Sequence, residues 1–588
     1  MISTIIKSNM YKDSVELMLL TSNVSSLEGV NHVSIMMATN ANKDILKQSG
    51  LLTEEVQSAS ADDMAIVFDV ETEEVSSNVL QVIEEFLTQS NTVEQTTISS
   101  VRNWDDAIAQ NPQANLAVFS IPGIYAAQEA HQALDLGLNV FMFSDNVSLE
   151  DEVILKKKAH DKGLLVMGPD CGTGILTGVP IAFTNKVSSG TIGVVGASGT
   201  GIQEVTTIID SLGSGISSAI GTGGRDLYNE VDGITMLDGL KALNAMDDTK
   251  VIVIISKPPH PRVKEKIENY IRSIEKPVVT VFIGSKPTHH EEGVYNAYTL
   301  EEAAYAAVAF DNGGNPYEFE LNRPKVEKDL SIDNKVIKGY YSGGTLAFET
   351  GMLIKEAMKI TEDSHSKEGF ILNNNGFEII DLGDDFYTQG RPHPMIDPNA
   401  RVEVMKKAID DPRTGIVLFD VVLGYGSHEN MAKSLADVVK ELTSKAKQAN
   451  RVVRFIATVC GTVHDFQGLK EQKQILSDVG VLIAESNAHA AIISLQLLGY
   501  DLSYTKRPVE KKISNKYSDD TEVSKNILNL LTNKPEIINV GLKGFASNLE
   551  KEGIIPVHFD WRPIAGGDKE LIKALRFLKS YDLTKGVQ

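Results

Sequence analysis

The chain has 588 residues, of which 42% are hydrophobic, so it is long enough for about four globular domains with buried cores. Its net charge of −23 argues against nucleic acid and anionic membrane surfaces as partners, whereas small anionic substrates stay compatible because distant charges are screened. The chain has two cysteines, Cys171 and Cys460, and neither a membrane-length apolar run nor a signal-peptide core, so we expect a cytoplasmic protein without a disulfide framework.

Residues 1–95 alternate short apolar strands with helical patterns, which predicts a small α/β sandwich of the ferredoxin-like kind. The predicted strands are 3–10, 30–38 and 64–70, and the predicted helices are 14–22, 43–49 and 76–88. This segment carries no recognisable catalytic constellation. We therefore expect it to dock partners or to support oligomerisation.

Residues 96–189 predict a Rossmann-like unit, because strands such as 116–122 and 139–145 alternate with helices and end in glycine, proline or serine turns. Ligands of such sheets lie at the carboxyl ends of the strands. The residues expected on that rim are Ser120, Ile121, Pro122, Ser144 and 170–173. A ligand bearing phosphate or carboxylate fits there; the alternative is a set of ordinary connections.

Residues 190–325 begin with an apolar strand, the turn Ser198-Gly199-Thr200 and a helix that extends to Leu212. A helix N-terminus leaves free backbone N–H groups and a positive dipole end, which together bind anions. The turn is therefore a candidate phosphate site, although glycine turns of this kind also occur in α/β units that bind nothing.

Residues 335–505 repeat this arrangement, with Ser342-Gly343-Gly344-Thr345 in the place of the first turn. The later strands of the two segments also keep step, which predicts two tandem domains of one flavodoxin-like kind. Two such domains tend to pair about a pseudo-twofold axis, so both helix N-termini would face one shared anion. We predict the active site there.

The chain turns polar after this second copy, and residues 506–533 predict a linker. Residues 534–588 then predict a short βαβ module that ends in a helix after Asp568. The expected fold is thus α/β and multidomain throughout.

Two strings resemble the succinyl-CoA synthetases: 167–175 is similar to the turn that closes their CoA-binding domain, and 193–205 to the opening of their α-subunit ligase domain. The second copy is similar to their β-subunit ligase domain. The resemblance implies that bound CoA would lie at Pro122, Asp170, Cys171 and Gly172.

In that family both helix N-termini face a phosphohistidine on a Gly-His-Ala-Gly-Ala loop, which this chain lacks. The corresponding region carries His289, and His464 in the second copy is an equally good candidate. The nucleotide-binding ATP-grasp domain of those synthetases is missing as well.

A more extensive resemblance runs through four long strings, 340–349, 381–398, 420–430 and 480–491, which are similar to the FdrA/AllF family of acyl-CoA-synthetase-like proteins of allantoin catabolism. It implies a subunit of oxamate carbamoyltransferase, which interconverts oxalurate plus phosphate and oxamate plus carbamoyl phosphate. The expected partners are the other subunits of that complex, whose AllG-type member the tail resembles. No cofactor is required on this interpretation, and an oligomer is expected.

That reaction joins two anions, so it needs preorganised donors and positive charge at the ureido carbonyl. Besides the turns Ser198-Gly199-Thr200 and Ser342-Gly343-Gly344-Thr345, the candidate catalytic residues are His464, His289, Arg391 and His393, and the candidate substrate-binding residues are Arg225, Asp226, Asp384, Asp385, Gly461 and Thr462. Solvated surface positions are the alternative for the arginines. Adjacent acids usually point apart, so we expect no metal site.

Two other functions stay open. The inherited fold favours an acyl-CoA synthetase that binds CoA. The unassigned N-terminal domain and the partner-like tail favour a non-catalytic scaffold of the complex.

Overall fold

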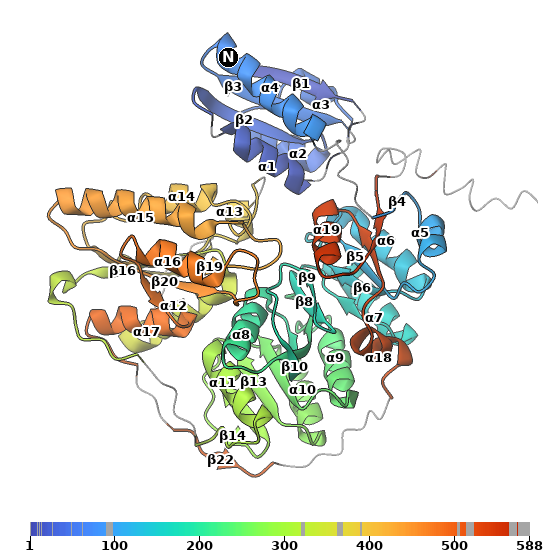
Figure 1. Ribbon diagram of the computed structural model, residues 1–588, viewed down its shortest axis with the longest axis vertical. Coiled ribbons are helices and arrows are strands. Elements are labelled where there is room, and N and C mark those ends of the chain that lie inside the picture. The colour runs from blue at the N-terminus through green and yellow to red at the C-terminus, as the bar shows by residue number, and fades with distance from the viewer. Residues whose placement is uncertain are drawn as a thin grey trace, which may run out of the picture.

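The structure is a computed structural model that describes residues 2–563, except 9, 11, 13, 26, 49, 61–62, 90–97, 319–323, 362–368, 389–390, 503–505 and 513–521, together with Lys573. Within these residues the strands form four sheets. Figure 1 shows the N-terminal domain apart from three α/β domains that pack together. The helix expected after Asp568 lies outside the described residues.

The N-terminal domain is a small antiparallel sheet, order β1-β3-β2, with helices on both faces. Alternate residues of β3 explain the two layers: Ile66 and Phe68 pack under α1 and α4, whereas Ala65 and Val67 pack under α2 and α3. The elements are β1 (Ile2–Lys7), α1 (Ser14–Ser25), β2 (Val30–Met37), α2 (Asn40–Gln48), α3 (Glu54–Ser58), β3 (Met64–Val70) and α4 (Glu73–Gln89).

The second domain has a six-stranded parallel sheet, order β4-β24-β23-β5-β6-β7, covered by helices as in a Rossmann-like fold. Its elements from the N-terminal side are β4 (Ser100–Val101), α5 (Trp104–Gln110), β5 (Leu116–Phe119), α6 (Gly123–Asp135), β6 (Asn139–Met142), α7 (Leu149–Lys162) and β7 (Val166–Met167). The C-terminal segment contributes α18 (Lys525–Thr532), β23 (Ile537–Val540), α19 (Lys543–Lys551) and β24 (Val557–Phe559).

This sheet corrects the prediction of a separate module at 534–588 and of a plain linker at 506–533. β23 lies between β5 and β24, and all four of its residues are buried. Trp104 on α5 meets Phe559 edge-on at 5.3 Å. The strand completes a sheet begun more than 400 residues earlier, and no local pattern reports so distant a partner.

The third domain contains the first ligase-like copy in a nine-stranded sheet, order β22-β14-β15-β13-β12-β10-β11-β8-β9. Its helices are α8 (Gly199–Ser211), α9 (Ile234–Ala245), α10 (Pro261–Ser273) and α11 (Leu300–Asp311). Its strands are β8 (Thr173–Leu176), β9 (Val179–Ala182), β10 (Ser189–Gly196), β11 (Ile216–Gly221), β12 (Val251–Ser256), β13 (Val278–Phe282), β14 (His290–Glu291), β15 (Val294–Ala297) and β22 (Val509–Glu510). The hairpin β8–β9 pairs with β11, so this domain begins near Thr173 rather than at the predicted residue 190.

The fourth domain contains the second copy, with sheet order β17-β18-β16-β19-β20-β21, parallel except for β17. Its strands are β16 (Val336–Tyr341), β17 (Phe370–Asn374), β18 (Phe377–Asp381), β19 (Thr414–Val422), β20 (Arg454–Cys460) and β21 (Leu482–Ala484). Its helices are the short η1 (Leu330–Ile332), α12 (Gly344–Met358), α13 (Asp385–Thr388), α14 (Asn399–Met405), α15 (Met431–Gln448), α16 (Leu469–Ser477) and α17 (Asn487–Leu497).

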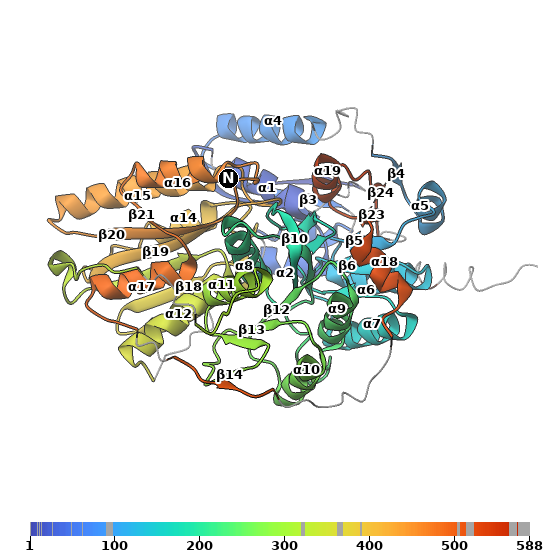
Figure 2. The ribbon, with the colours of Figure 1, turned by 60° about the horizontal axis from the view of Figure 1, so that its bottom comes forward.

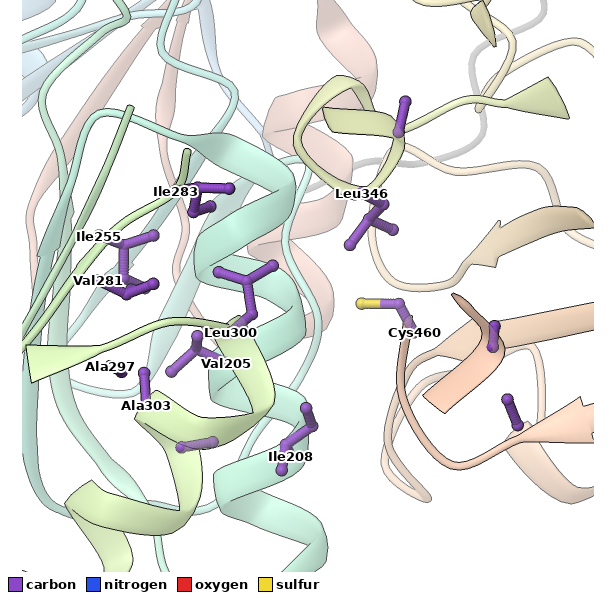
Figure 3. Packing of buried hydrophobic residues seen from close by; sticks show 14 of the residues in the cluster. Val205, Ile208, Ile255, Val281, Ile283, Ala297, Leu300, Ala303, Leu346 and Cys460 are labelled. Carbon is purple, nitrogen blue, oxygen red and sulfur yellow. The ribbon is translucent and has the colours of Figure 1, made fainter. Parts of the chain in front are cut away.

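The two ligase-like domains pack through α8 and α11 on one side and α12 and α17 on the other (Figure 2). A continuous apolar core joins them and includes Val205, Leu300, Leu346 and Cys460 (Figure 3). Burial of such a shared core stabilises the domain pair because apolar surface leaves water on both sides.

A glutamate of each domain also accepts a backbone hydrogen bond from the other domain across this interface. Glu204 on α8 accepts the backbone N–H of Asn487 at the start of α17 over 2.9 Å. Glu349 on α12 accepts the N–H of Leu300 at the start of α11 over 2.8 Å. Each domain thus caps a helix of the other, a reciprocal arrangement that agrees with a pseudo-twofold axis.

Candidate functional site

The N-termini of α8 and α12 meet side chain to side chain. Ser198 is the N-cap of α8, and its Oγ accepts the N–H of Gly201 over 3.1 Å. The same Oγ lies 2.6 Å from Oγ1 of Thr345 in the first turn of α12. The structure therefore brings the two predicted turns to one place, where hydroxyl groups and helix dipoles converge.

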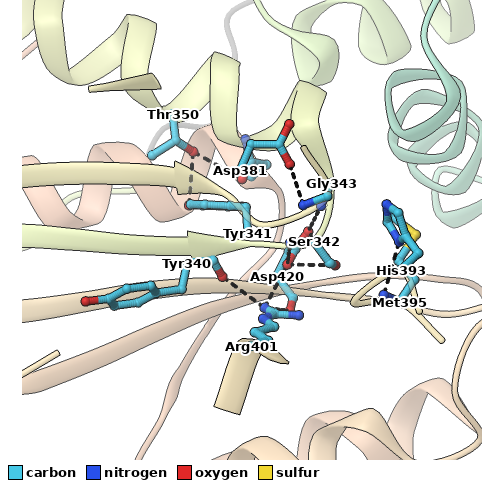
Figure 4. A network of polar contacts seen from close by, with 12 residues as sticks. Tyr340, Tyr341, Ser342, Gly343, Thr350, Asp381, His393, Met395, Arg401 and Asp420 are labelled. Atoms are coloured by element: carbon cyan, nitrogen blue, oxygen red, sulfur yellow. Dashed lines mark hydrogen bonds and ion pairs between the residues drawn. The ribbon is translucent and has the colours of Figure 1, made fainter. Parts of the chain in front are cut away.

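The start of α12 differs from the prediction, because an internal carboxylate already binds part of it (Figure 4). Asp420 accepts the N–H of Ser342 over 2.9 Å and that of Gly343 over 2.8 Å. Its charge is balanced by Arg401, whose Nη2 lies 2.7 Å away, and both side chains are fully buried. The amides of Ser342 and Gly343 are therefore not free for a phosphate, which corrects their assignment as anion donors.

Asp420 and Arg401 were not identified from the sequence. The available signal was an aspartate inside the apolar run of β19, Thr414–Val422, whose nine residues are all buried. A charge in a buried strand must be paired, and its position near the carboxyl end of a parallel strand points toward the neighbouring turns.

Asp381 and His393 also lie at this helix end (Figure 4). Asp381 ends β18, and its Oδ1 accepts the N–H of Gly383 over 2.9 Å. A Cβ at Gly383 would lie 2.7 Å from Nε2 of His393 and 2.9 Å from the carbonyl oxygen of Ser342, so only glycine fits between them. Of the four predicted catalytic residues, His393 is the one that lies beside this turn.

Burial shifts the pKa of both titratable groups toward their neutral forms. Burial, with smaller effects of Asp384 and Asp420, raises the pKa of Asp381 to about 7, against the opposing Gly383 N–H and Lys257. Burial lowers the pKa of His393 to about 4. The imidazole Nδ1 accepts the N–H of Met395 over 3.2 Å, so the proton of the neutral ring is on Nε2.

The remaining predicted residues of the fourth domain have other contacts. Arg391 is exposed and pairs with the equally exposed Glu403 at 3.4 Å. Asp384 accepts the N–H of Phe386 over 3.0 Å, and Asp385 is an exposed residue that begins α13. These contacts place the three residues in a surface turn, and their catalytic and substrate-binding roles stay predictions.

The loop of Gly461, Thr462 and His464 fastens the fourth domain to the third. Thr462 Oγ1 donates to the carbonyl oxygen of Lys186 over 2.5 Å. His464 is about half exposed, and its Nε2 lies 4.0 Å from a carboxylate oxygen of Asp210. His464 therefore lies at a domain junction, and its catalytic role stays a prediction.

His289 lies away from the helix N-termini. Its Nε2 is 3.9 Å from Glu510, and the nearby Lys286 pairs with Glu356 in the last turn of α12. The loop after β13 is short and returns directly into β14, so His289 lines a separate cavity of about 230 Å³ with Lys264. His289 therefore lies apart from the two helix N-termini, and its catalytic role stays a prediction.

Arg225 and Asp226 make ion pairs between two domains. Asp226 is buried, accepts the N–H of Met236 over 2.9 Å and pairs with Lys156 of α7 at 2.8 Å. Arg225 pairs with Glu152 of α7 at 2.8 Å. Both ion pairs join the second domain to the third.

The rim on which CoA was expected is partly covered by the C-terminal segment. The N–H of Leu542 donates to Ser120 Oγ over 2.7 Å, and Phe545 packs edge-on against Phe143 at 5.2 Å. Pro122 is the N-cap of α6. The backbone of Gly172 accepts the N–H of Phe183 over 2.8 Å.

Two side chains of this rim have shifted pKa values. Burial raises the pKa of the Cys171 thiol to about 12, so it stays protonated. Burial, with the charges of Asp145 and Asp385, raises the pKa of Asp170 to about 6.

A search of the described residues finds no group of three or more histidine, cysteine, aspartate or glutamate side chains arranged to hold a metal ion. Within the same part of the chain, the helices are too short or too polar to cross a membrane.

Three family models match the chain. Residues 1–102 match the AllF heavy metal-associated domain, 187–284 the CoA binding domain and 340–496 the CoA-ligase domain. The CoA binding match falls on the third domain, whereas the sequence placed a CoA-binding-type domain at 96–189. Both cysteines lie outside 1–102, so the AllF-type domain has no thiol ligand for a heavy metal.

Among curated proteins, the chain is 39% identical to the uncharacterized protein YahF of Escherichia coli over 511 residues, 84% of this chain and 98% of that protein. It is 26% identical to succinate–CoA ligase subunit alpha 1 of Archaeoglobus fulgidus, over 37% of this chain and 76% of that subunit. The alpha subunit of Staphylococcus aureus is 30% identical over 29% of this chain and 57% of its own length.

Among solved structures, the dinucleotide-forming acetyl-coenzyme A synthetase 1 of Ca. Korarchaeum cryptofilum shares 18% identity over 65% of this chain and 82% of its own. Its TM-score of 0.28 is too low to support any argument about arrangement. The domain matches and the extent of the likeness to YahF decide the family: the chain belongs to the AllF family of acyl-CoA-synthetase-like proteins, related to the succinate–CoA ligases.

Proposed function

We propose that this chain is a subunit of oxamate carbamoyltransferase, interconverting oxalurate plus phosphate and oxamate plus carbamoyl phosphate. The observation that carries the proposal is the meeting of the two helix N-termini at Ser198 and Thr345, 2.6 Å apart, with His289 elsewhere. The Ser198 and Thr345 hydroxyls are hydrogen-bonded to each other, so the pair keeps one hydroxyl proton for a ligand. That donor and the two helix dipoles suit a phosphate anion that is not attached to a histidine.

The asymmetry of the two turns supports a more specific placement. Asp420 binds the first amides of α12, so its negative charge opposes a second anion there. The N-cap of α8 is a neutral serine, followed by Gly199 and Thr200. We therefore assign the phosphate to the α8 side, with Thr345 completing its shell.

The chemistry joins hydrogen phosphate to the ureido carbon, so the enzyme must stabilise the charge that develops on the carbonyl oxygen. His393 suits this task because the neutral ring presents Nε2–H as a donor near the same turn. No nucleotide or CoA enters this reaction. The N-terminal domain lies apart from the others, and we propose that it docks the partner subunits of an oligomeric complex (Figure 1).

An acyl-CoA synthetase is the second candidate, favoured by the matches to the CoA binding and CoA-ligase domains. It predicts CoA binding to the isolated chain, measurable by titration calorimetry. The carbamoyltransferase proposal predicts carbamoyl transfer in the absence of CoA.

The test is a colorimetric ureido assay of the chain co-expressed with its partner subunits, given carbamoyl phosphate and oxamate without CoA or nucleotide. We expect oxalurate formation that falls sharply in a Ser198→Ala, Thr345→Val double variant. The matched control is Asp437→Asn, an exposed acid on α15 that pairs only with lysines. Absence of product with every partner set, together with tight CoA binding, contradicts the proposal and supports the synthetase.

A further inference from the structure

Asp381 is a carboxyl group that the sequence did not identify and that lies at the candidate site. It is paired in register with Tyr341, so it leaves the sheet beside the turn that begins α12. A Cβ at Gly344 would lie 2.4 Å from its Oδ2, which places the carboxyl against the first residue of the helix. The next residue is Thr345, which contacts Ser198.

The surroundings of Asp381 differ from those of Asp420, although both carboxyls lie at the same helix end. Asp420 receives two backbone N–H groups, the Ser342 hydroxyl and the Arg401 guanidinium. Asp381 receives the single N–H of Gly383 and is partly exposed. Asp420 is therefore fully buried with both oxygens bonded, whereas Asp381 is partly exposed and accepts one backbone hydrogen bond among the described residues.

The charged and titratable groups that face Asp381 come from several elements. Asp384 and Asp420 disfavour its anion. Lys257, which follows β12 of the third domain and lies 5.6 Å from the ring of Phe348, favours it. His393, across Gly383, is neutral. The balance leaves a carboxyl able to both give and take a proton near neutral pH.

We propose that Asp381 is the proton relay of the carbamoyl transfer, a role that rests on the proposed function. In phosphorolysis an oxygen of hydrogen phosphate forms a bond to the ureido carbon, and the bond from that carbon to the oxamate nitrogen breaks. The electron pair of the broken bond goes to nitrogen, which takes the proton of the Asp381 carboxyl. The carboxylate then takes the proton that hydrogen phosphate brought, so atoms and charge balance.

A relay is chemically required because an amide anion is a poor leaving group without a general acid. His393 does not serve, since its low pKa leaves it neutral and its Nε2–H is a weak acid. The buried pair Asp420–Arg401 does not serve either, because both oxygens of Asp420 already accept hydrogen bonds from Ser342, Gly343 or Arg401.

The relay predicts that the rates of phosphorolysis and of synthesis depend on pH in opposite ways; each falling part of a rate–pH profile is called its limb. Phosphorolysis needs protonated Asp381, so its rate falls as pH rises through the pKa of about 7. Synthesis of oxalurate from oxamate and carbamoyl phosphate needs the carboxylate, so its rate falls as pH drops through the same value. A merely structural carboxyl would not produce limbs that mirror each other.

The experiment measures both directions against pH for the wild-type complex, Asp381→Asn, Asp381→Glu and the control Asp437→Asn. We expect Asp381→Asn to lower kcat on the order of 100-fold or more and to remove both limbs, with partial recovery in Asp381→Glu. Thermal unfolding and the KM for carbamoyl phosphate show that each variant is folded and binds.

The outcomes separate the relay from the proposed function. An active wild-type complex with unchanged limbs in Asp381→Asn overturns the relay alone. A wild-type complex without activity in either direction overturns the proposed function and the relay with it. If Asp381→Asn does not fold, retained limbs in the folded Asp381→Glu variant at a shifted pKa support the relay, and their absence overturns it.

Discussion

The N-termini of α8 and α12 occupy equivalent places in the two ligase-like domains, yet they are satisfied in different ways. α8 is capped by its own residue, Ser198. The N-cap residue of α12 is Gly343, which has no side chain, and Asp420 from β19 accepts its N–H instead. Duplication has thus kept the backbone arrangement while placing the negative charge on one side only. This difference supports the proposal that α8 binds the anion and that proton transfer takes place near α12.

The largest effect is expected from removing the carboxylate that caps α12. Asp420→Ala leaves Arg401 buried and unpaired, which costs about 3–5 kcal/mol of unfolding free energy. Chemical denaturation of the purified chain measures the loss. Asp437→Asn, an exposed acid in the same domain, serves as the control and should stay close to wild type. If Asp420→Ala lost no more unfolding free energy than the control, the Asp420 carboxylate would not be what stabilises the start of α12.

The next effect tests the symmetry that the two helices share. Glu204→Ala and Glu349→Ala each leave a buried helix N–H without its acceptor, at about 1–3 kcal/mol per site. Both glutamates contact Asn487, so a double-mutant cycle should show coupling between them. Strictly additive losses would contradict a common interface network.

The same interface predicts a pH dependence of stability. Burial raises the pKa of Glu349 to about 7 and that of Glu301 to about 8, from an ordinary value of 4.5. The folded chain therefore holds protons that the unfolded chain has lost, so the stabilisation is complete below pH 4.5 and declines as pH rises to about 8. Denaturation midpoints between pH 5 and 8 should decline less in Glu349→Gln and Glu301→Gln variants. An identical slope in variants and wild type would contradict the shifted pKa values.

The smallest effect concerns the cap of α8. Ser198→Ala removes one side-chain cap, at about 1 kcal/mol of unfolding free energy. A Ser198→Asp variant keeps a capping oxygen but adds a negative charge, so it should restore stability while phosphate binding stays weak. Recovery of phosphate binding in Ser198→Asp would remove the contrast between the two helix ends.

The strand-turn-helix repeats were predictable because hydrophobic periodicity and glycine turns are local signals. The proximity of Ser198 and Thr345 was predictable because the chain carries this strand-turn-helix pattern twice. The sequence could not show that β23 inserts beside β5, since the pairing joins residues more than 400 positions apart. Such a contact leaves no mark on the local pattern of either strand.

The site was predicted only in part. Glycine turns mark where a backbone can bind an anion, but they do not reveal an internal carboxylate such as Asp420 that already binds there. The spacing of His289 and His464 after a strand predicted catalytic histidines. In the structure His289 lies near Glu510 and His464 near Asp210. Asp381 was missed because its pKa depends on burial and on Lys257 from another domain.

The most direct test is a crystal or cryo-EM structure of the complex with carbamoyl phosphate and oxamate. The account predicts the phosphate at the N-terminus of α8, against the hydrogen-bonded hydroxyls of Ser198 and Thr345, with the carbamoyl group facing Asp381 and His393. A phosphate bound in the cavity beside His289 and Lys264, with the helix N-termini free of ligand, would contradict it.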